Sequence, residues 1–264
     1  MAATAIRIIL GMAAAYLIAL LALYFAQSRF IYPAPQDRHE PALGFQEVVL
    51  RTGDGLDLNA HWKPPEAKQP TAVFFHGNGG SLAGATRETQ LLAVQGYGLL
   101  LVNYRGYGGN PGEPSEQGFY NDGRAAMAFV KGQRVTPEQT IIIGNSIGTG
   151  TAMQMAVEHD PAALILTAPF TSLTDVAAEA LPIFPVRSLL RDEFNNAQKL
   201  SGYDGKVLIQ HGTVDKVVPY KFGKRLSGVN ETSRFETFEG AGHDLSFLEQ
   251  AQIQQSEWLS AIGL

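Results

Sequence analysis

The sequence has 264 residues, of which 45% are hydrophobic and 17% are charged, so it can bury the core of one large domain or of two small ones. Its net charge is −5 and no block of like charges occurs, which argues against a nucleic acid as the main partner. The absence of cysteine excludes disulfide bonds, thiolate zinc sites and a cysteine nucleophile.

The amino-terminal segment predicts a single-pass membrane anchor, which we place at residues 1–27. An uncharged apolar run extends from Ile8 to Ala26, and as a helix this run is about 28 Å long, close to the thickness of the bilayer's hydrocarbon core. A cleaved signal peptide is the alternative, but the run is longer than the usual apolar region of such peptides, and cleavage at its end would put Tyr24 where a small residue is required. Arg7 precedes the run and Arg29 follows it, so the positive charges leave open which side of the membrane the rest of the chain faces.

Residues 28–43 contain three prolines and predict an extended linker. The globular domain is expected over residues 44–264. It begins with two strand-like segments, Phe45 to Thr52 and Leu56 to Trp62, which are separated by a glycine-rich turn and predict a β-hairpin.

From Thr71 onward, short apolar segments alternate with longer helical patterns. The predicted strands are 71–75, 97–103, 140–143, 162–166, 206–210 and 232–238, and the predicted helices are 81–95, 116–131, one directly after Ser146, and 245–262. This alternation predicts an α/β fold with a mostly parallel, doubly wound sheet and an antiparallel hairpin at its amino-terminal edge. Such a sheet carries its chemistry at the carboxyl ends of its strands.

Residues 170–204 interrupt this alternation with an apolar, proline-containing insertion. Two interpretations stay open. The insertion is either a small lid or acyl-binding wall over the reactive site, or it is ordinary helix packing against the sheet.

The pentapeptide Gly144-Asn145-Ser146-Ile147-Gly148 directly follows an apolar strand. A G-x-S-x-G sequence in this position predicts a sharp turn between strand and helix, with the serine at its apex. Glycine is required on both sides, because the strand and the helix approach too closely for side chains there. Ser146 is therefore the candidate nucleophile.

A serine hydroxyl needs a base to take its proton and a third group to orient that base. Among the histidines that follow Ser146, His243 lies in a glycine-rich turn after the last strand and is the candidate base. Asp215 follows the strand that ends at His211 and is the candidate acid. The rival acids, none of which directly follows a clear strand, are Asp175, Asp192, Asp204 and Asp244.

Acyl transfer also requires two backbone N–H groups that stabilise the developing oxyanion. One is expected from Ile147, the residue after the nucleophile. The other is expected from the glycine-rich loop after the first parallel strand, where Asn78 is the first choice and Gly79 the second. His76, in the same loop, is interpreted as a hydrogen-bond partner that braces the loop.

Several short segments together resemble the α/β-hydrolase superfamily, and in particular its single-pass membrane-anchored serine hydrolases. They are the segments 144–150, 76–79, 104–108, 168–173, 211–215 and 240–243, together with Phe30-Ile31-Tyr32-Pro33 after the anchor. The resemblance extends from about Leu20 to the end of the chain. It implies hydrolysis of ester, thioester or lysophospholipid bonds through an acyl-enzyme.

The sequence thus predicts a membrane-anchored serine hydrolase in which Ser146, His243 and Asp215 form a catalytic triad. The expected partners are a small-molecule or lipid acyl substrate and the membrane itself, and no metal or other cofactor is expected because the motifs that bind them are missing. A serine peptidase on the same fold and a non-catalytic membrane-tethered scaffold are the alternatives.

Overall fold

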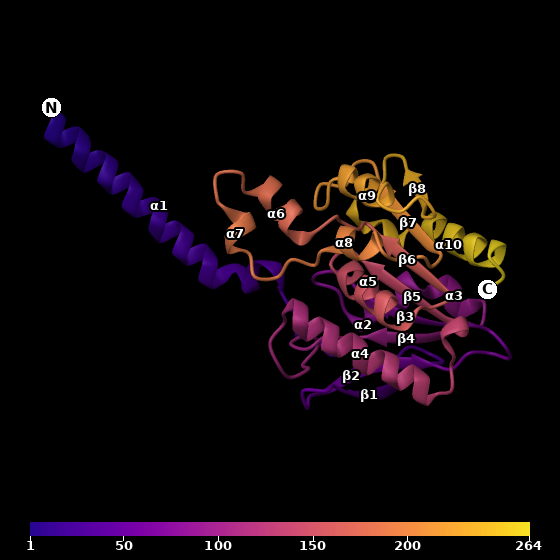
Figure 1. Cartoon of the computed structure of the whole chain (residues 1–264). Coiled ribbons are helices and arrows are strands. Elements are labelled where there is room, and N and C mark those ends of the chain that lie inside the picture. The colour runs from indigo at the N-terminus through magenta and orange to yellow at the C-terminus, as the bar shows by residue number, and fades with distance from the viewer.

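The computed structural model describes the whole chain, residues 1–264, as an α/β domain from which a long amino-terminal helix projects (Figure 1). The strands are β1 (Gln46–Arg51), β2 (Asp57–Lys63), β3 (Thr71–Phe75), β4 (Gly98–Val102), β5 (Thr140–Asn145), β6 (Ala163–Thr167), β7 (Val207–Gly212) and β8 (Arg234–Phe238). They form one sheet in the order β1-β2-β4-β3-β5-β6-β7-β8. The pairs β1·β2 and β2·β4 are antiparallel, and all the other pairs are parallel. The predicted mostly parallel sheet with an antiparallel amino-terminal hairpin is confirmed.

The central strands are apolar on both faces, as strands covered by helices on both sides must be. Every residue of β3, β4, β5 and β6 is buried. Alternate residues point into two separate cores: Val73 and Phe75 belong to the larger one, and Ala72 and Phe74 to the smaller one on the other face.

Helices fill the two layers beside the sheet. They are α2 (Leu82–Glu88), α3 (Gln90–Val94), α4 (Glu116–Gly132), α5 (Gly148–His159), α6 (Leu173–Ala180), α7 (Val186–Leu189), α8 (Asn196–Leu200), α9 (Tyr220–Ser227) and α10 (Glu249–Ala261), with short 3-10 helices η1 (Pro137–Gln139) and η2 (His243–Phe247). The larger core joins the sheet to α4, α5, α8 and α9, and the smaller core joins it to α2, α3 and α10.

Three local details differ from the sequence expectations. The helix predicted for 81–95 is divided into α2 and α3 at Thr89, whose backbone leaves the helical region (φ −112°, ψ 12°). The last helix begins at Glu249 and is preceded by η2. Helix α9 was not predicted, although it buries Phe222 and Leu226, which are four residues apart on one face.

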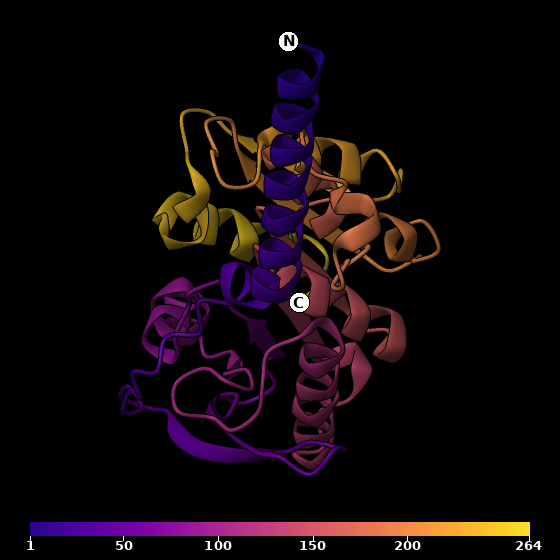
Figure 2. The ribbon, with the colours of Figure 1, turned by 90° about the vertical axis from the view of Figure 1, so that its left-hand side faces the viewer.

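The amino-terminal helix α1 (Ala2–Ile31) has 30 residues and none of them is buried. It is about 45 Å long at 1.5 Å per residue. It continues four residues into the segment 28–43 that the sequence predicts as an extended linker. Figure 2 shows α1 in front of the domain, with its carboxyl-terminal end near the middle of the molecule and its amino terminus beyond the domain.

The rest of the linker lies against the domain. Tyr32 is buried, packs edge-on against Phe119, and donates a hydrogen bond from its hydroxyl to Asp192 (2.9 Å). The Gly108 N–H donates to the Pro35 carbonyl at 2.7 Å. These contacts fix the exit of α1 relative to the sheet.

Candidate active site

Ser146 stands at the turn between β5 and α5. Its φ is +52°, a left-handed conformation that is costly for a residue with a side chain. The turn is held by the Ser146 N–H, which donates to the Thr167 carbonyl at the end of β6 (2.9 Å). The neighbouring strand thus fixes a conformation that the serine would not adopt alone.

Steric crowding explains why both outer positions of the pentapeptide are glycine. A side-chain carbon at Gly144 would lie 2.7 Å from the Ala152 methyl group and from the Gly148 carbonyl. One at Gly148 would collide with the Phe75 carbonyl, and would lie 2.6 Å from the His76 carbonyl. The predicted close approach of strand and helix is therefore present, and it brings the loop after β3 next to Ser146.

Ser146, His243 and Asp215, which lie far apart in the sequence, meet at the carboxyl edge of the sheet. The Ser146 hydroxyl lies 2.9 Å from Nε2 of His243, and Nδ1 of His243 lies 2.8 Å from Oδ2 of Asp215. Because an ionised carboxylate only accepts hydrogen bonds, the His243 proton sits on Nδ1 and Nε2 is free to accept the serine proton. Ser146 and Asp215 are buried, whereas the His243 side chain is 22% exposed.

Asp215 is held as a carboxylate. Burial alone would raise its pKa, but hydrogen bonds from His211 and His243 and the charge of His243 bring the pKa well below its usual range. Its other oxygen, Oδ1, accepts from the N–H groups of Val217 and Val218 (2.8 and 2.9 Å). The carboxylate is therefore both ionised and fixed in direction.

His211 is a further partner of Asp215 that the sequence did not assign. Its ring is fully buried, and Nε2 lies 2.8 Å from the Val218 carbonyl and 3.3 Å from Oδ2 of Asp215. Since a carbonyl only accepts, His211 carries its proton on Nε2 and shares it between the two oxygens. Its position at the end of β7, four residues before Asp215, was the available signal.

The rival aspartates lie elsewhere. Asp175 pairs with Arg187 at 2.8 Å, and Asp192 accepts from Tyr32 and from the Glu116 N–H. Neither these two nor Asp204 or Asp244 is hydrogen-bonded to His243. Asp215 is the aspartate that the fold brings to this histidine.

The two expected oxyanion donors are on adjacent segments. The N–H groups of Asn78 and Ile147 donate to no acceptor within the protein. A side-chain carbon at Gly77 would lie 3.3 Å from the Ser146 side chain, so the loop that carries Asn78 touches the serine. The Asn78 side chain accepts from the Tyr107 hydroxyl at 3.2 Å, which ties this loop to the one after β4.

His76 is fully buried behind this loop. Its Nδ1 lies 2.8 Å from the Gly77 carbonyl, and its ring packs edge-on against Tyr104 with 4.6 Å between centroids. Burial lowers the pKa of His76, so the ring is held in its neutral form. This placement agrees with a bracing residue.

A second cluster that the sequence did not reveal connects the serine turn to the histidine loop. The Asn145 side-chain amide donates to Glu88 (2.7 Å) and to the Ser246 hydroxyl (2.9 Å). Asn145 precedes Ser146, Ser246 lies three residues after His243, and Glu88 ends α2. Burial raises the pKa of Glu88, against hydrogen bonds from Ser246 and Asn145 that lower it. Glu88 lies among polar residues in Thr86-Arg87-Glu88-Thr89, so nothing in the sequence marked it as buried.

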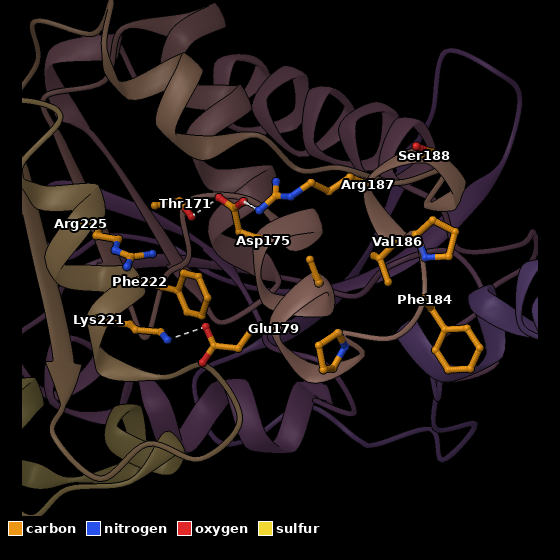
Figure 3. A pocket seen from close by; sticks show the side chains of 13 residues that line it. Thr171, Asp175, Glu179, Phe184, Val186, Arg187, Ser188, Lys221, Phe222 and Arg225 are labelled. Carbon is orange, nitrogen blue, oxygen red and sulfur yellow. Dashed lines mark hydrogen bonds and ion pairs between the residues drawn. The ribbon is translucent and has the colours of Figure 1, made fainter.

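The predicted insertion forms α6, α7 and α8. A pocket of about 810 Å³ lies between α6, α7 and α9. Figure 3 shows two ion pairs across it, Asp175 with Arg187 and Glu179 with Lys221 (2.8 and 2.6 Å). Neither Ser146 nor His243 lines this pocket, so it is separate from the candidate active site.

Comparison with known proteins agrees with the fold. The profile described as the alpha/beta hydrolase fold matches residues 70–194. An uncharacterized protein of Mycobacterium tuberculosis is 37% identical over 83% of this chain and 80% of its own length. The lysophosphatidylserine lipase ABHD12 of Danio rerio is 29% identical over 76% of this chain and 56% of its own length. The Pyrococcus furiosus esterase Pf2001 superposes with a TM-score of 0.69 at 18% identity, over 86% of this chain and 96% of that structure, which shows a shared fold. The chain belongs to the α/β-hydrolase superfamily.

Proposed function

We propose that this protein is a membrane-anchored serine hydrolase that cleaves carboxylic ester or thioester bonds through an acyl-enzyme on Ser146. The observation that carries the proposal is the continuous hydrogen-bonded series from the Ser146 hydroxyl through His243 to Asp215, with distances of 2.9 and 2.8 Å. A series of this geometry is what activates a serine hydroxyl.

In the first half of the reaction, Oγ of Ser146 attacks the acyl carbonyl carbon while Nε2 of His243 takes the hydroxyl proton. Asp215 stabilises the imidazolium that forms. The carbonyl oxygen becomes an oxyanion and accepts hydrogen bonds from the N–H groups of Asn78 and Ile147. When the intermediate collapses, the bond to the alcohol or thiol breaks and His243 returns the proton to the leaving group.

In the second half, a water molecule attacks the acyl-enzyme while His243 takes one of its protons. The ester bond to Ser146 breaks, the carboxylic acid leaves, and the proton returns to Oγ. The enzyme is restored without any group beyond its own side chains and water.

We further propose that α1 anchors the enzyme in a membrane. The mean hydropathy of its most apolar 18-residue window is 2.4, and that window is not buried in the protein. No charge occurs between Arg7 and Arg29, so the helix is apolar over enough length to cross the hydrocarbon core. An anchored nucleophile suits acylated or lipid substrates, and the similarity to a lysophosphatidylserine lipase supports that class.

The test is a substrate panel with the full-length protein in detergent micelles. We expect turnover of p-nitrophenyl esters and of thioesters, little turnover of matched peptide anilides, and loss of both ester and thioester turnover in Ser146→Ala. Preference for the anilides would favour the peptidase alternative. Equal turnover by Ser146→Ala and the unmodified protein would overturn the assignment of the nucleophile.

A further inference from the structure

The connection between α6 and α7 exposes an apolar tip, Leu181-Pro182-Ile183-Phe184-Pro185. Ile183 is 72% exposed and Leu181 is 39% exposed. The tip contains no polar side chain, and none of the residues of α6 before it is buried. A run of exposed apolar residues of this kind marks a surface that another apolar phase covers.

The tip contacts α1 halfway along the helix. The Phe184 ring stacks on Tyr16, with 5.8 Å between centroids and 2° between planes. The Tyr16 hydroxyl donates to the Ile183 carbonyl at 2.8 Å. Tyr16 lies in the middle of the uncharged run from Ile8 to Ala26, so the tip sits at the same level as the centre of that run.

We infer that this tip enters one leaflet of the bilayer beside α1, so that the insertion is a second membrane contact. The inference rests on the proposed anchoring by α1. It adds a lipid-facing surface that is separated from the anchor by about 150 residues of sequence.

The backbone of the tip suits a medium without water. In hydrocarbon, each unpaired N–H or carbonyl group costs several kcal/mol. Pro182 and Pro185 have no N–H, the N–H groups of Leu181 and Phe184 donate to Ala177 and Leu181, and the carbonyls of Phe184 and Pro185 accept from Val186 and Ser188. The hydrogen bond from the Tyr16 hydroxyl to the Ile183 carbonyl gives both of these polar groups a partner. Only the Ile183 N–H and the Pro182 carbonyl are left without a partner in the tip.

Polar contacts appear where the headgroups are expected. The Arg191 guanidinium lies over the Tyr24 ring at 4.9 Å and donates to the Tyr24 carbonyl at 2.8 Å. The Arg191 N–H donates to the Gln27 side chain at 2.9 Å. Tyr24 and Tyr16 are about 12 Å apart along the helix axis. If Tyr24 and Arg191 mark the headgroup level, the tip lies within one leaflet, whose hydrocarbon half is about 15 Å thick.

The pocket continues from the tip toward α9. Pro182, Phe184 and Pro185 line one end of it, and Phe222 and Arg225 line the other. Figure 3 shows the Arg187 side chain turned away from Phe184 and toward Asp175, so this charge points to the pocket and not to the tip. Most of the pocket lining is polar or charged, so the apolar surface offered to lipid is the tip itself and not the pocket.

The test uses the natural absence of cysteine. Three single-cysteine variants of the full chain, Ile183→Cys, Leu17→Cys on α1 and Val94→Cys on α3, are labelled with an environment-sensitive nitrobenzoxadiazole dye. Each is reconstituted into phosphatidylcholine vesicles with or without spin-labelled lipids. Leu17 and Val94 are 58% and 77% exposed, so all three sites accept the dye.

We expect spin-labelled lipid to quench the dyes at positions 183 and 17 several-fold more than the dye at position 94. Quenching at 17 with none at 183 would overturn the inference and leave the anchor in place. No quenching at 17 would instead overturn the anchor. A blue-shifted emission at 183 without quenching by lipid would show a protein cover, such as a second copy, and would also overturn the inference.

A matched pair of variants tests the role of the hydrogen bond. Tyr16→Phe keeps the stacked ring and removes the donor to Ile183, whereas Tyr24→Phe makes the same change at a hydroxyl that bonds no protein group. With the dye at position 183, we expect quenching by deep spin labels to fall in Tyr16→Phe and to stay unchanged in Tyr24→Phe. Equal profiles in the two variants would contradict the part assigned to Tyr16.

Discussion

The carboxyl edge of the sheet and the assembly of α1 with the α6–α7 insertion use their side chains in opposite ways. At the edge, polar groups are buried and paired: Asp215 receives hydrogen bonds from two histidines and two backbone N–H groups. In the insertion, apolar groups are exposed and Ile183 has almost no protein around it. Buried polar groups fix one geometry, because each has few alternative partners. Exposed apolar groups instead indicate a surface that something outside the domain covers, which we propose to be lipid.

The largest expected effect is on catalysis at the edge. Asp215→Asn keeps the acceptor for the N–H groups of Val217 and Val218, but its amide donates toward His243 and favours the wrong tautomer. We expect kcat for ester hydrolysis to fall by about 10⁴-fold with the fold retained. Asp175→Asn in the insertion is the matched control. Because ion pairs at the protein surface are weak, and because Asp175 does not contact the triad, we expect this variant to change kcat less than 2-fold. Similar losses in the two variants would remove the distinction between the regions.

The next effect concerns Glu88, which we treat as a positioning residue. Glu88→Ala removes one of the two acceptors of the Asn145 amide and leaves only the Ser246 hydroxyl, whereas Glu88→Gln keeps an acceptor oxygen at this position. We expect Glu88→Ala to lower kcat by about 10- to 100-fold at nearly constant KM, and Glu88→Gln to recover most of the loss. A merely structural role would predict a loss of melting temperature with unchanged kcat in the folded fraction.

A smaller effect is expected in the dependence of stability on pH. His61 is buried in β2, both of its ring nitrogens lack a partner, and burial lowers its pKa. Below a pH of about 6.5, this histidine therefore binds a proton more readily in the unfolded chain than in the folded protein. The free energy of unfolding falls as the pH decreases from there, by at most about 1.4 kcal/mol per pH unit for one proton.

Urea unfolding at pH 7.5 and pH 5.5 measures this slope. The variant His61→Leu should lose less stability between the two pH values than the unmodified protein. An identical slope in both proteins would show that His61 does not contribute to it.

The smallest effect on stability is expected at the tip. Ile183→Ser removes an exposed side chain, so in detergent the free energy of unfolding should change by no more than about 0.5 kcal/mol. Differential scanning calorimetry checks this value. A loss of several kcal/mol would mean that Ile183 is part of the protein core and not a surface for lipid.

Much of the fold, and the meeting of Ser146, His243 and Asp215, could be predicted from sequence because they depend on local patterns. The buried parallel strands appear in the sequence as short apolar runs. The candidate serine, aspartate and histidine follow three different strands, in that order along the chain. Glu88, Ser246 and His211 escaped because their significance depends on contacts between distant segments. Likewise, Tyr16 is an ordinary residue of an apolar helix until the fold places Ile183, 167 residues away, beside it.

The most direct test of the central claim is covalent labelling of Ser146. The full-length protein is incubated with a serine-reactive fluorophosphonate and digested, and the modified peptide is identified by mass spectrometry. We expect one adduct, on Ser146, that is lost in Ser146→Ala and strongly slowed in His243→Ala. An adduct on another residue, or equal labelling of Ser146→Ala and the unmodified protein, would contradict the assignment of Ser146 as the nucleophile.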